Sequence, residues 1–166
     1  STLFNTMGPL LSPARPEFQI MGIANYKLAT TIAETMKSVG RSRALVVHGA
    51  GTDEIAVHGE TLVWELKDGA ISHYTVEPAE LGVDRHTLVD LRGGDGEHNA
   101  AAMRATFAGE GPVAHRDAVA VNAGAMFYLY GIADSLAEGT AHAKQLLADV
   151  SVSQWLTTHE EADYSG

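Results

Sequence analysis

An adjacent pair of acidic residues follows an apolar segment in the first third of the chain. Asp53 and Glu54 end the stretch 43–54, which reads RALVVHGAGTDE. Carboxylate oxygens are the ligands that Mg²⁺ prefers, and in enzymes this ion commonly bridges one or two carboxylates and the phosphates of a substrate. The pair is therefore a candidate magnesium site, although adjacent acids in a loop more often cap a helix or face solvent.

The elements before the pair predict where it lies. Residues 44–47, Ala-Leu-Val-Val, have the continuous apolar pattern of a strand covered on both faces, and Gly49 and Gly51 end it. A shorter apolar strand is expected over 18–23, and helical spacing predicts a helix over 26–39 that ends at Gly40. Residues 18–48 then form a parallel β-α-β unit. Ligands bind at the carboxyl ends of such strands, which is where the acidic pair is placed.

The rest of the chain predicts a hairpin followed by helices. Strands over 61–67 and 70–76 flank Asp68 and Gly69, a dipeptide that suits a type I′ turn. Helical composition covers 97–109, 115–130, 135–149 and 152–161. Ser135 and Glu138 match a capping box, and Asp95 is placed to cap the first of these helices. The expected fold is α/β, with a mostly parallel central sheet, a β-hairpin and a helical C-terminal half.

Composition excludes several classes of function. The 166 residues include 11 Lys and Arg against 21 Asp and Glu, a net charge of −10 that disfavours binding to nucleic acid or to anionic membranes. The longest uncharged apolar-leaning run, 118–130, is shorter than the roughly 20 residues of a membrane span. The chain has no cysteine, which rules out thiolate chemistry and favours a cytoplasmic location. Because it begins at Ser1 without Met, we expect a processed product or one piece of a longer protein.

Other catalytic patterns find no support in the sequence. The loop HGAGTDE lacks the Lys and Ser/Thr of a Walker A motif, so a tight turn is a better interpretation of its glycines than a phosphate cradle. The eight histidines show no H-E-x-x-H zinc motif, and there is no G-x-S-x-G elbow for a hydrolase. We therefore predict no catalytic side chain and no residue that binds an organic cofactor in this chain, and assign Asp53 and Glu54 to a metal only.

The ordered motifs of the chain resemble the C-terminal half of the anthranilate phosphoribosyltransferase family, a group of enzymes of tryptophan biosynthesis. The segments that carry this resemblance are, in order, LFNTMGPLLSPARP, QIMGIAN, SVGRSRALVVHGAGTDEI, TLVWELKDGAI, LRGGDGEHNA and VAVNAGAMFYLYG. Together they cover most of residues 2–139. The shared order is far more specific than any one segment.

The resemblance implies a function. Enzymes of this family transfer phosphoribosyl from phosphoribosyl pyrophosphate to anthranilate and release pyrophosphate, with Mg²⁺ held partly by an acidic pair that corresponds to Asp53 and Glu54. A metal clamp there stabilises the charge that accumulates on the leaving group, so neither acid needs to transfer a proton. The resemblance also implies a homodimer for the full-length protein.

The chain departs from the family in ways that limit what it can do alone. The family's glycine-rich pyrophosphate loop, its Lys-His-Gly-Asn segment and its anthranilate-contacting Arg belong to an N-terminal half that is missing here, and residues 48–60 contain no Lys or Arg to hold phosphate. His98 replaces a common acid and Ser12 a common Asn. We expect residues 1–13 to be a hinge remnant, residues 14–166 the α/β domain, and the isolated chain to be inactive.

Two alternatives remain open from the sequence. One is a relative of pyrimidine nucleoside phosphorylase, in which phosphate attacks a nucleoside; the GTDE loop together with LFNTMGPL favours the transferase instead. The other is a non-catalytic nucleic-acid-binding paralogue, which the net charge of −10 disfavours because such binding needs a basic face.

Overall fold

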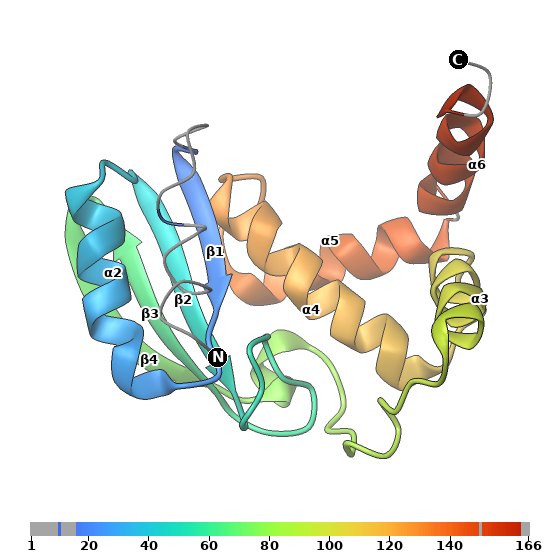
Figure 1. Ribbon diagram of the computed structural model, residues 1–166, viewed down its shortest axis with the longest axis horizontal. Helices are drawn as coiled ribbons and strands as arrows, with labels where there is room; N and C mark the ends of the chain where they lie inside the picture. Colours follow the sequence, from blue (N-terminus) through green and yellow to red (C-terminus); the bar gives the residue numbers. More distant parts are fainter. Residues whose placement is uncertain (1–9, 11–15, 150, 164–166) are drawn as a thin grey trace.

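A four-stranded sheet forms the centre of the fold (Figure 1). The computed structural model describes residues 10, 16–149 and 151–163. In it, the strands β1 (Phe18–Gly22), β2 (Arg43–Gly49), β3 (Thr61–Lys67) and β4 (Ala70–Val76) lie in the order β1-β2-β3-β4. The predicted α/β class and hairpin are confirmed, and the turn residues Asp68 and Gly69 both have the positive φ of a type I′ turn, 51° and 74°.

The prediction of a mostly parallel sheet is wrong for the described strands. β1 and β2 are parallel, with Phe18 opposite Arg43, whereas β2–β3 and β3–β4 are antiparallel. For the next strand to run parallel to β2, the chain would have to cross back to the end of the sheet where β2 begins, and such a crossover is usually a helix. The segment from Ala50 to Glu60 contains no helix and stays at the end where β2 finishes, so β3 returns in the opposite direction.

Helices cover both faces of the sheet (Figure 1). The 3₁₀ turn η2 (Tyr26–Leu28) and helix α2 (Ala29–Ser38) connect β1 to β2 and lie on one face. After β4 come the 3₁₀ turn η3 (Pro78–Leu81) and helices α3 (Gly96–Phe107), α4 (Val113–Leu129), α5 (Leu136–Ala148) and α6 (Ser151–Asp163). Helix α4 packs on the opposite face, and α5 packs along α4. The expected helical C-terminal half is confirmed.

Alternation along β2 explains the two cores. Ala44 and Val46 face α2, while Leu45 and Val47 face α4, and all four are at most 1% exposed. Side chains of a strand point to opposite faces in turn, so a strand with helices on both sides must be apolar at every position. The continuous apolar run in the sequence is a consequence of this three-layer packing.

The helix ends agree in most cases with the local signals of the sequence. Asp95 accepts a hydrogen bond from the His98 N–H at 2.9 Å and caps α3, and Ser135 Oγ accepts from the Glu138 N–H at 3.1 Å. The Glu138 carboxylate, however, accepts from the N–H of Asp134 and does not close the box on Ser135. A reciprocal capping box does form at η3, where Glu77 and Glu80 each accept from the other's backbone.

The described part of the chain contains no helix long and apolar enough to cross a membrane. The expected hinge remnant at 1–13 lies outside the described residues apart from Leu10, which is buried against the α2 face of the sheet.

Candidate functional site

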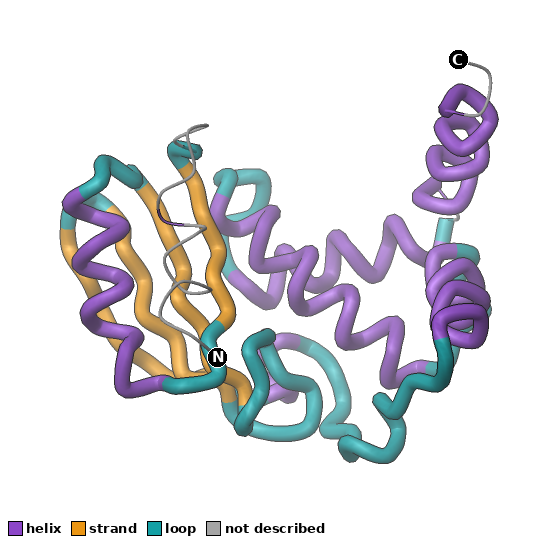
Figure 2. The backbone as a smooth tube through the Cα atoms, in the orientation of Figure 1, coloured by secondary structure: helices purple, strands orange, loops and turns teal. Residues whose placement is uncertain are grey.

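The acidic pair lies on a loop held against the carboxyl ends of β1 and β2. Residues 49–52 form a tight turn in which the backbone groups of Gly49 and Thr52 exchange hydrogen bonds of 3.1 and 2.9 Å. Ala50 and Gly51 have φ of 47° and 95°, so the turn needs the left-handed region at both central positions. The predicted tight turn is therefore confirmed. Figure 2 shows this loop at the end of the sheet where β1 and β2 finish, beside the loop that follows η3.

Two glycines allow the loop to approach the sheet closely. A Cβ on Gly22, the last residue of β1, would overlap the carbonyl of Asp53. A Cβ on Gly49, the last residue of β2, would lie 2.6 Å from the Ala56 nitrogen. Any larger residue at either strand end would push the loop outward. Gly22 was not identified from the sequence as part of the site, because a glycine at a strand end also fits an ordinary turn.

Side chains from distant elements fasten the loop after the acidic pair. The Asn122 carboxamide of α4 accepts from the Ile55 N–H at 3.0 Å and donates to the Ile55 carbonyl at 3.1 Å. Thr61 Oγ1, at the start of β3, accepts from the Ala56 N–H at 2.9 Å. On the other side, the His86 N–H donates to the Val57 carbonyl at 2.8 Å. The backbone from Ile55 to Val57 is thus fixed on several sides.

Asp53 and Glu54 themselves are exposed. No group of three or more His, Cys, Asp or Glu side chains that could hold a metal ion occurs among the described residues. Two exposed carboxylates do fit Mg²⁺, which keeps several waters and takes one or two carboxylates together with substrate phosphates. The metal role of the pair therefore stays a prediction, and what the structure shows is two exposed carboxylates on a backbone fixed by hydrogen bonds.

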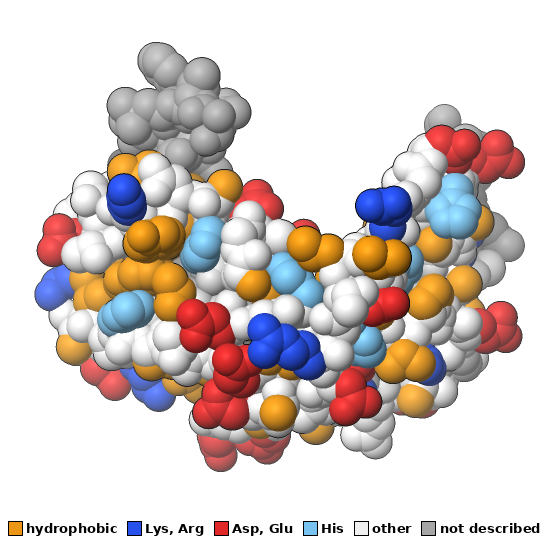
Figure 3. Space-filling view, turned by 90° about the horizontal axis from the view of Figure 1, so that it is seen from below, with side chains coloured by type: hydrophobic (Ala, Val, Ile, Leu, Met, Phe, Trp, Pro, Cys, Tyr) orange, Lys and Arg blue, Asp and Glu red, His pale blue; other side chains and the backbone are white. Residues whose placement is uncertain are grey.

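A basic residue reaches this loop from elsewhere in the chain. Arg85, in the loop after η3, donates through Nε to the His58 carbonyl at 3.2 Å and lies 3.7 Å from the Glu77 carboxylate. The sequence contains no Lys or Arg within residues 48–60, and only the fold shows that Arg85 supplies one. Figure 3 views the molecule from this end, and basic and acidic side chains meet near the middle of that face.

A second glycine-rich segment, 92–96 (RGGDG), shares a pocket with Glu54 of the acidic pair. Glu54 lines a pocket of about 320 Å³ together with Gly93, Asn99 and His115, and with apolar residues of α3 and α4. Asn99 accepts from the Gly94 N–H at 2.8 Å and donates to the Gly94 carbonyl at 3.1 Å, which ties the glycine segment to α3. The helix-cap role expected for Asp95 is confirmed, and Gly93 of the same segment lines the pocket with Glu54.

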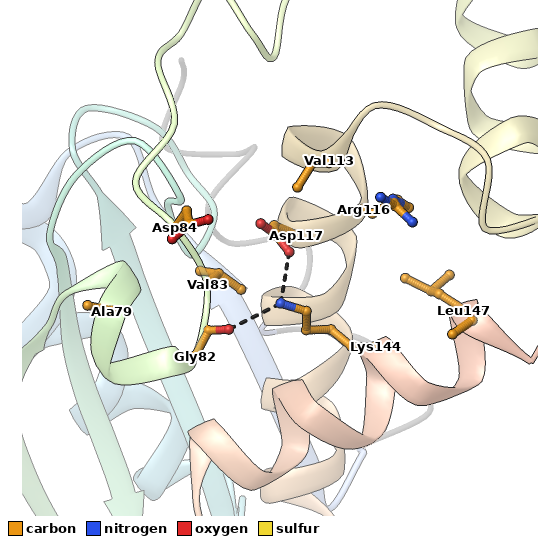
Figure 4. A pocket seen from close by; sticks show the side chains of 10 residues that line it. Ala79, Gly82, Val83, Asp84, Val113, Arg116, Asp117, Lys144 and Leu147 are labelled. Carbon is orange, nitrogen blue, oxygen red and sulfur yellow. Dashed lines mark hydrogen bonds and ion pairs between the residues drawn. The ribbon is translucent and has the colours of Figure 1, made fainter.

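A larger pocket, of about 640 Å³, lies between η3, α4 and α5 (Figure 4). Asp117, only 3% exposed, accepts from His86 Nε2 at 2.8 Å and from Lys144 Nζ at 3.2 Å, and Lys144 also donates to the Gly82 carbonyl at 3.1 Å. Figure 4 shows the Lys144 ammonium between those two acceptors. Asp117, His86, Lys144 and the Gly82 carbonyl thus form one network that joins three elements. No sequence signal indicated it, because its members are far apart in the chain. Arg116, which also lines the pocket, donates through Nη1 to the Gly109 carbonyl at 2.9 Å, while its buried Nε has no hydrogen-bond partner among the described residues.

A buried carboxylate lies on the α4 side of the sheet. Glu65 of β3 is 6% exposed and accepts from the hydroxyl groups of Tyr74, at 2.9 Å, and Tyr128, at 2.7 Å. Burial, followed by the charge of Glu65, raises the pKa of Tyr74; burial and the hydrogen bond to Glu65 raise the pKa of Tyr128. The guanidinium of Arg43 lies 4.9 Å from the centre of the Tyr128 ring. These groups connect strands and helix on the α4 side of the sheet.

Comparison with known proteins identifies the family. The model of the glycosyl transferase family, a/b domain, matches residues 1–151. The chain belongs to this family. Among relatives of this glycosyl transferase domain, the anthranilate phosphoribosyltransferases of Corynebacterium aurimucosum and Corynebacterium glutamicum are 65% and 67% identical to it over 164 and 165 residues. The predicted resemblance is confirmed.

Solved structures show the same fold for this glycosyl transferase domain. Anthranilate phosphoribosyltransferase from Thermus thermophilus superposes with a TM-score of 0.84 at 39% identity, covering 95% of this chain and 46% of that one. The Saccharomyces cerevisiae enzyme, solved in complex with PRPP and Mg, has a TM-score of 0.79 at 24% identity over 92% of this chain and 44% of that one, a likeness of fold. The chain spans about half the length of these relatives, 48% and 47% for the two Corynebacterium proteins.

Proposed function

We propose that this chain provides the magnesium-binding wall of an anthranilate phosphoribosyltransferase, with Asp53 and Glu54 as the metal-binding residues. The full-length protein would transfer phosphoribosyl from phosphoribosyl pyrophosphate to anthranilate. The observation that carries the proposal is the loop itself: two exposed carboxylates on an ordered backbone at the carboxyl ends of β1 and β2. The Corynebacterium and Thermus thermophilus relatives, which carry that name, support the choice of reaction.

The residues present fit the role of holding a metal-bound pyrophosphate. Bound Mg²⁺ would neutralise charge that builds up on the leaving group. Asp53 and Glu54 would hold the ion from one side, and the fixed backbone of 55–57 would keep the carboxylates in place during the reaction. Arg85, which donates to the His58 carbonyl of the same loop, would add positive charge there, offset in part by Glu77 at 3.7 Å. No proton transfer is assigned to any of these groups.

The remaining groups of the site would come from the other half of the full-length protein. We expect phosphate-binding and anthranilate-binding residues there, and a homodimer for the whole enzyme; both follow from the resemblance. The boundary between a hinge remnant at 1–13 and an α/β domain at 14–166, and a cytoplasmic location, also stay proposals. On this basis the 166-residue chain alone forms no phosphoribosyl adduct of anthranilate, and such activity in the purified chain would contradict the proposal.

The test replaces each acid in the full-length protein that contains this chain. Asp53→Asn and Glu54→Gln each remove one negative charge and nearly preserve shape, so we expect a loss of about 10²-fold in kcat/KM and a higher Mg²⁺ concentration for half-maximal rate. Glu60→Gln is the matched control, because Glu60 is an exposed acid of the same loop. An unchanged Mg²⁺ dependence in both acid variants would refute the metal role.

A further inference from the structure

Asn122 makes an unusual set of contacts for a residue in the middle of a helix. It lies on α4, partly buried, and its carboxamide forms three hydrogen bonds. One, from Nδ2 to the Ala118 carbonyl at 3.0 Å, stays within the helix. The other two join the carboxamide to both backbone groups of Ile55, which is 67 residues away in sequence. The Asn122 carboxamide therefore accepts from and donates to the backbone of the same residue, as a neighbouring strand would.

The helix itself gives no reason for asparagine at this position. Asn is among the poorer residues for a helix interior, since its amide competes for backbone hydrogen bonds. Its neighbours on α4 are mostly small and apolar, including Ala118, Ala120, Ala123 and Ala125. An alanine at 122 would make a better helix. The polar side chain is explained by what it does for the loop that faces α4.

Ile55 directly follows the acidic pair, so its backbone determines where the pair is placed. Its side chain is 2% exposed and lies in the core between the sheet and α4, whereas Glu54 is exposed. The N–H and the carbonyl of Ile55 are both held by Asn122, and the next N–H, of Ala56, is held by Thr61. The first hydrogen-bonded anchor after the carboxylates is therefore a side chain of α4.

We infer that Asn122 is a positioning residue for the Asp53–Glu54 metal site: it holds the Ile55 backbone and so fixes the two carboxylates relative to α4. The inference rests on the proposed function. Without the Asn122 carboxamide the Ile55 backbone loses two hydrogen bonds and the loop becomes more mobile. Binding of Mg²⁺ would then have to order the loop. A loop that must be ordered on binding lowers the apparent affinity for the ion.

The test compares Asn122→Ala with Thr140→Val in the full-length protein. Thr140 is 1% exposed, and its hydroxyl donates to the Leu136 carbonyl of its own helix. Its replacement by valine therefore removes a buried hydrogen-bonding group without touching the loop. Two readouts are needed. One is hydrogen exchange at the Ile55 amide in metal-free protein, and the other is the Mg²⁺ concentration that gives half-maximal rate.

For Asn122→Ala we expect exchange at Ile55 to accelerate about tenfold or more and the Mg²⁺ concentration to rise about tenfold, with both unchanged in Thr140→Val. If Asn122→Ala does not fold, Asn122→Asp replaces it, since it keeps an acceptor for the Ile55 N–H and loses both donor bonds. Equal Mg²⁺ dependence in the Asn122 and Thr140 variants overturns the inference. If Asp53→Asn shifts the Mg²⁺ dependence and the Asn122 variant does not, the proposed function stands and only this inference fails.

Discussion

Replacement of Gly124 by alanine should destabilise the protein, although alanine is the better helix former. Gly124 lies on α4 where α5 crosses it, and Gly139 of α5 faces it. A Cβ on Gly124 would lie 2.6 Å from the Gly139 carbonyl carbon and from the Thr140 Cα, and closer still to the Thr140 nitrogen. All of these are backbone atoms, which cannot rotate away. The crossing therefore depends on a residue without a side chain.

The size of the effect follows from two opposing terms. Ordinary contact begins near 3.4 Å, so relieving the contact with the Thr140 nitrogen would require α5 to move by about 1 Å. Overpacking of this kind costs about 3 kcal/mol at the upper end of its range, and the higher helix propensity of alanine returns about 1 kcal/mol. A net loss of about 2 kcal/mol corresponds to a fall of about 4–8 °C in Tm for a chain of this length.

Thermal unfolding followed by circular dichroism measures this change. Gly96→Ala is the matched control, because Gly96 opens α3 and a Cβ there meets nothing within 4 Å. We expect Gly96→Ala to be neutral or slightly stabilising, since it carries the gain in helix propensity without the clash. If Gly124→Ala were as stable as the parent protein, the close helix crossing would not limit the packing of α4 and α5, and the reasoning would be refuted.

Two further predictions concern the buried polar groups. The pKa values of Tyr74 and Tyr128 are raised by burial and by Glu65. The folded protein therefore keeps these two protons at a pH where the unfolded chain loses them. The free energy of unfolding is at its full value below about pH 10 and falls as the pH rises above it. Urea unfolding between about pH 9 and pH 11 should show this fall, and Tyr74→Phe should reduce it, while an identical slope in the variant would contradict the assignment. Asp117→Ala leaves His86 and Lys144 without their shared acceptor and should lower the free energy of unfolding by about 2 kcal/mol. Lys144→Ala should lower it by about 1 kcal/mol or less, because Lys144 is 43% exposed and Asp117 keeps its hydrogen bond with His86. Equal losses in the two variants, measured by the same unfolding experiment, would show that Asp117 is not the centre of the network.

The sequence predicted the elements whose signals are local. Strand β2 is identified by a continuous apolar run, the hairpin by Asp68 and Gly69, and α3 and α5 by their caps Asp95 and Ser135. Each of these signals depends on residues within a few positions of one another. The boundaries of these two helices differ from the prediction by one or two residues, which is the usual fraying at helix ends.

Strand direction after β2 could not be predicted in the same way. The segment between Gly49 and Thr61 is long enough to suggest a crossover, and nothing in its composition shows that the Ile55 and Val57 side chains return to the core at the same end of the sheet. Only the packing of those two residues against α4 shows that the chain reverses and that β3 is antiparallel.

The residues of the candidate site also differ in whether the sequence could indicate them. Asp53 and Glu54 were identified from type and position, because they are adjacent and follow a buried strand. Arg85 and Asn122 were not, because each reaches the loop through the fold. A lone asparagine among the alanines of a helix was the one signal in the sequence that could have indicated Asn122.

The hydrogen bonds between Asn122 and Ile55 also bear on the order in which the protein folds. They join groups 67 residues apart, whereas the β3–β4 hairpin closes over a two-residue turn. Closing the longer loop costs more chain entropy and is rewarded only once α4 has docked on the sheet. The β3–β4 hairpin can therefore form early, while the loop that carries the acidic pair is still unfixed. The fixed geometry of the Asp53–Glu54 loop is therefore a late product of folding, completed when α4 docks on the sheet.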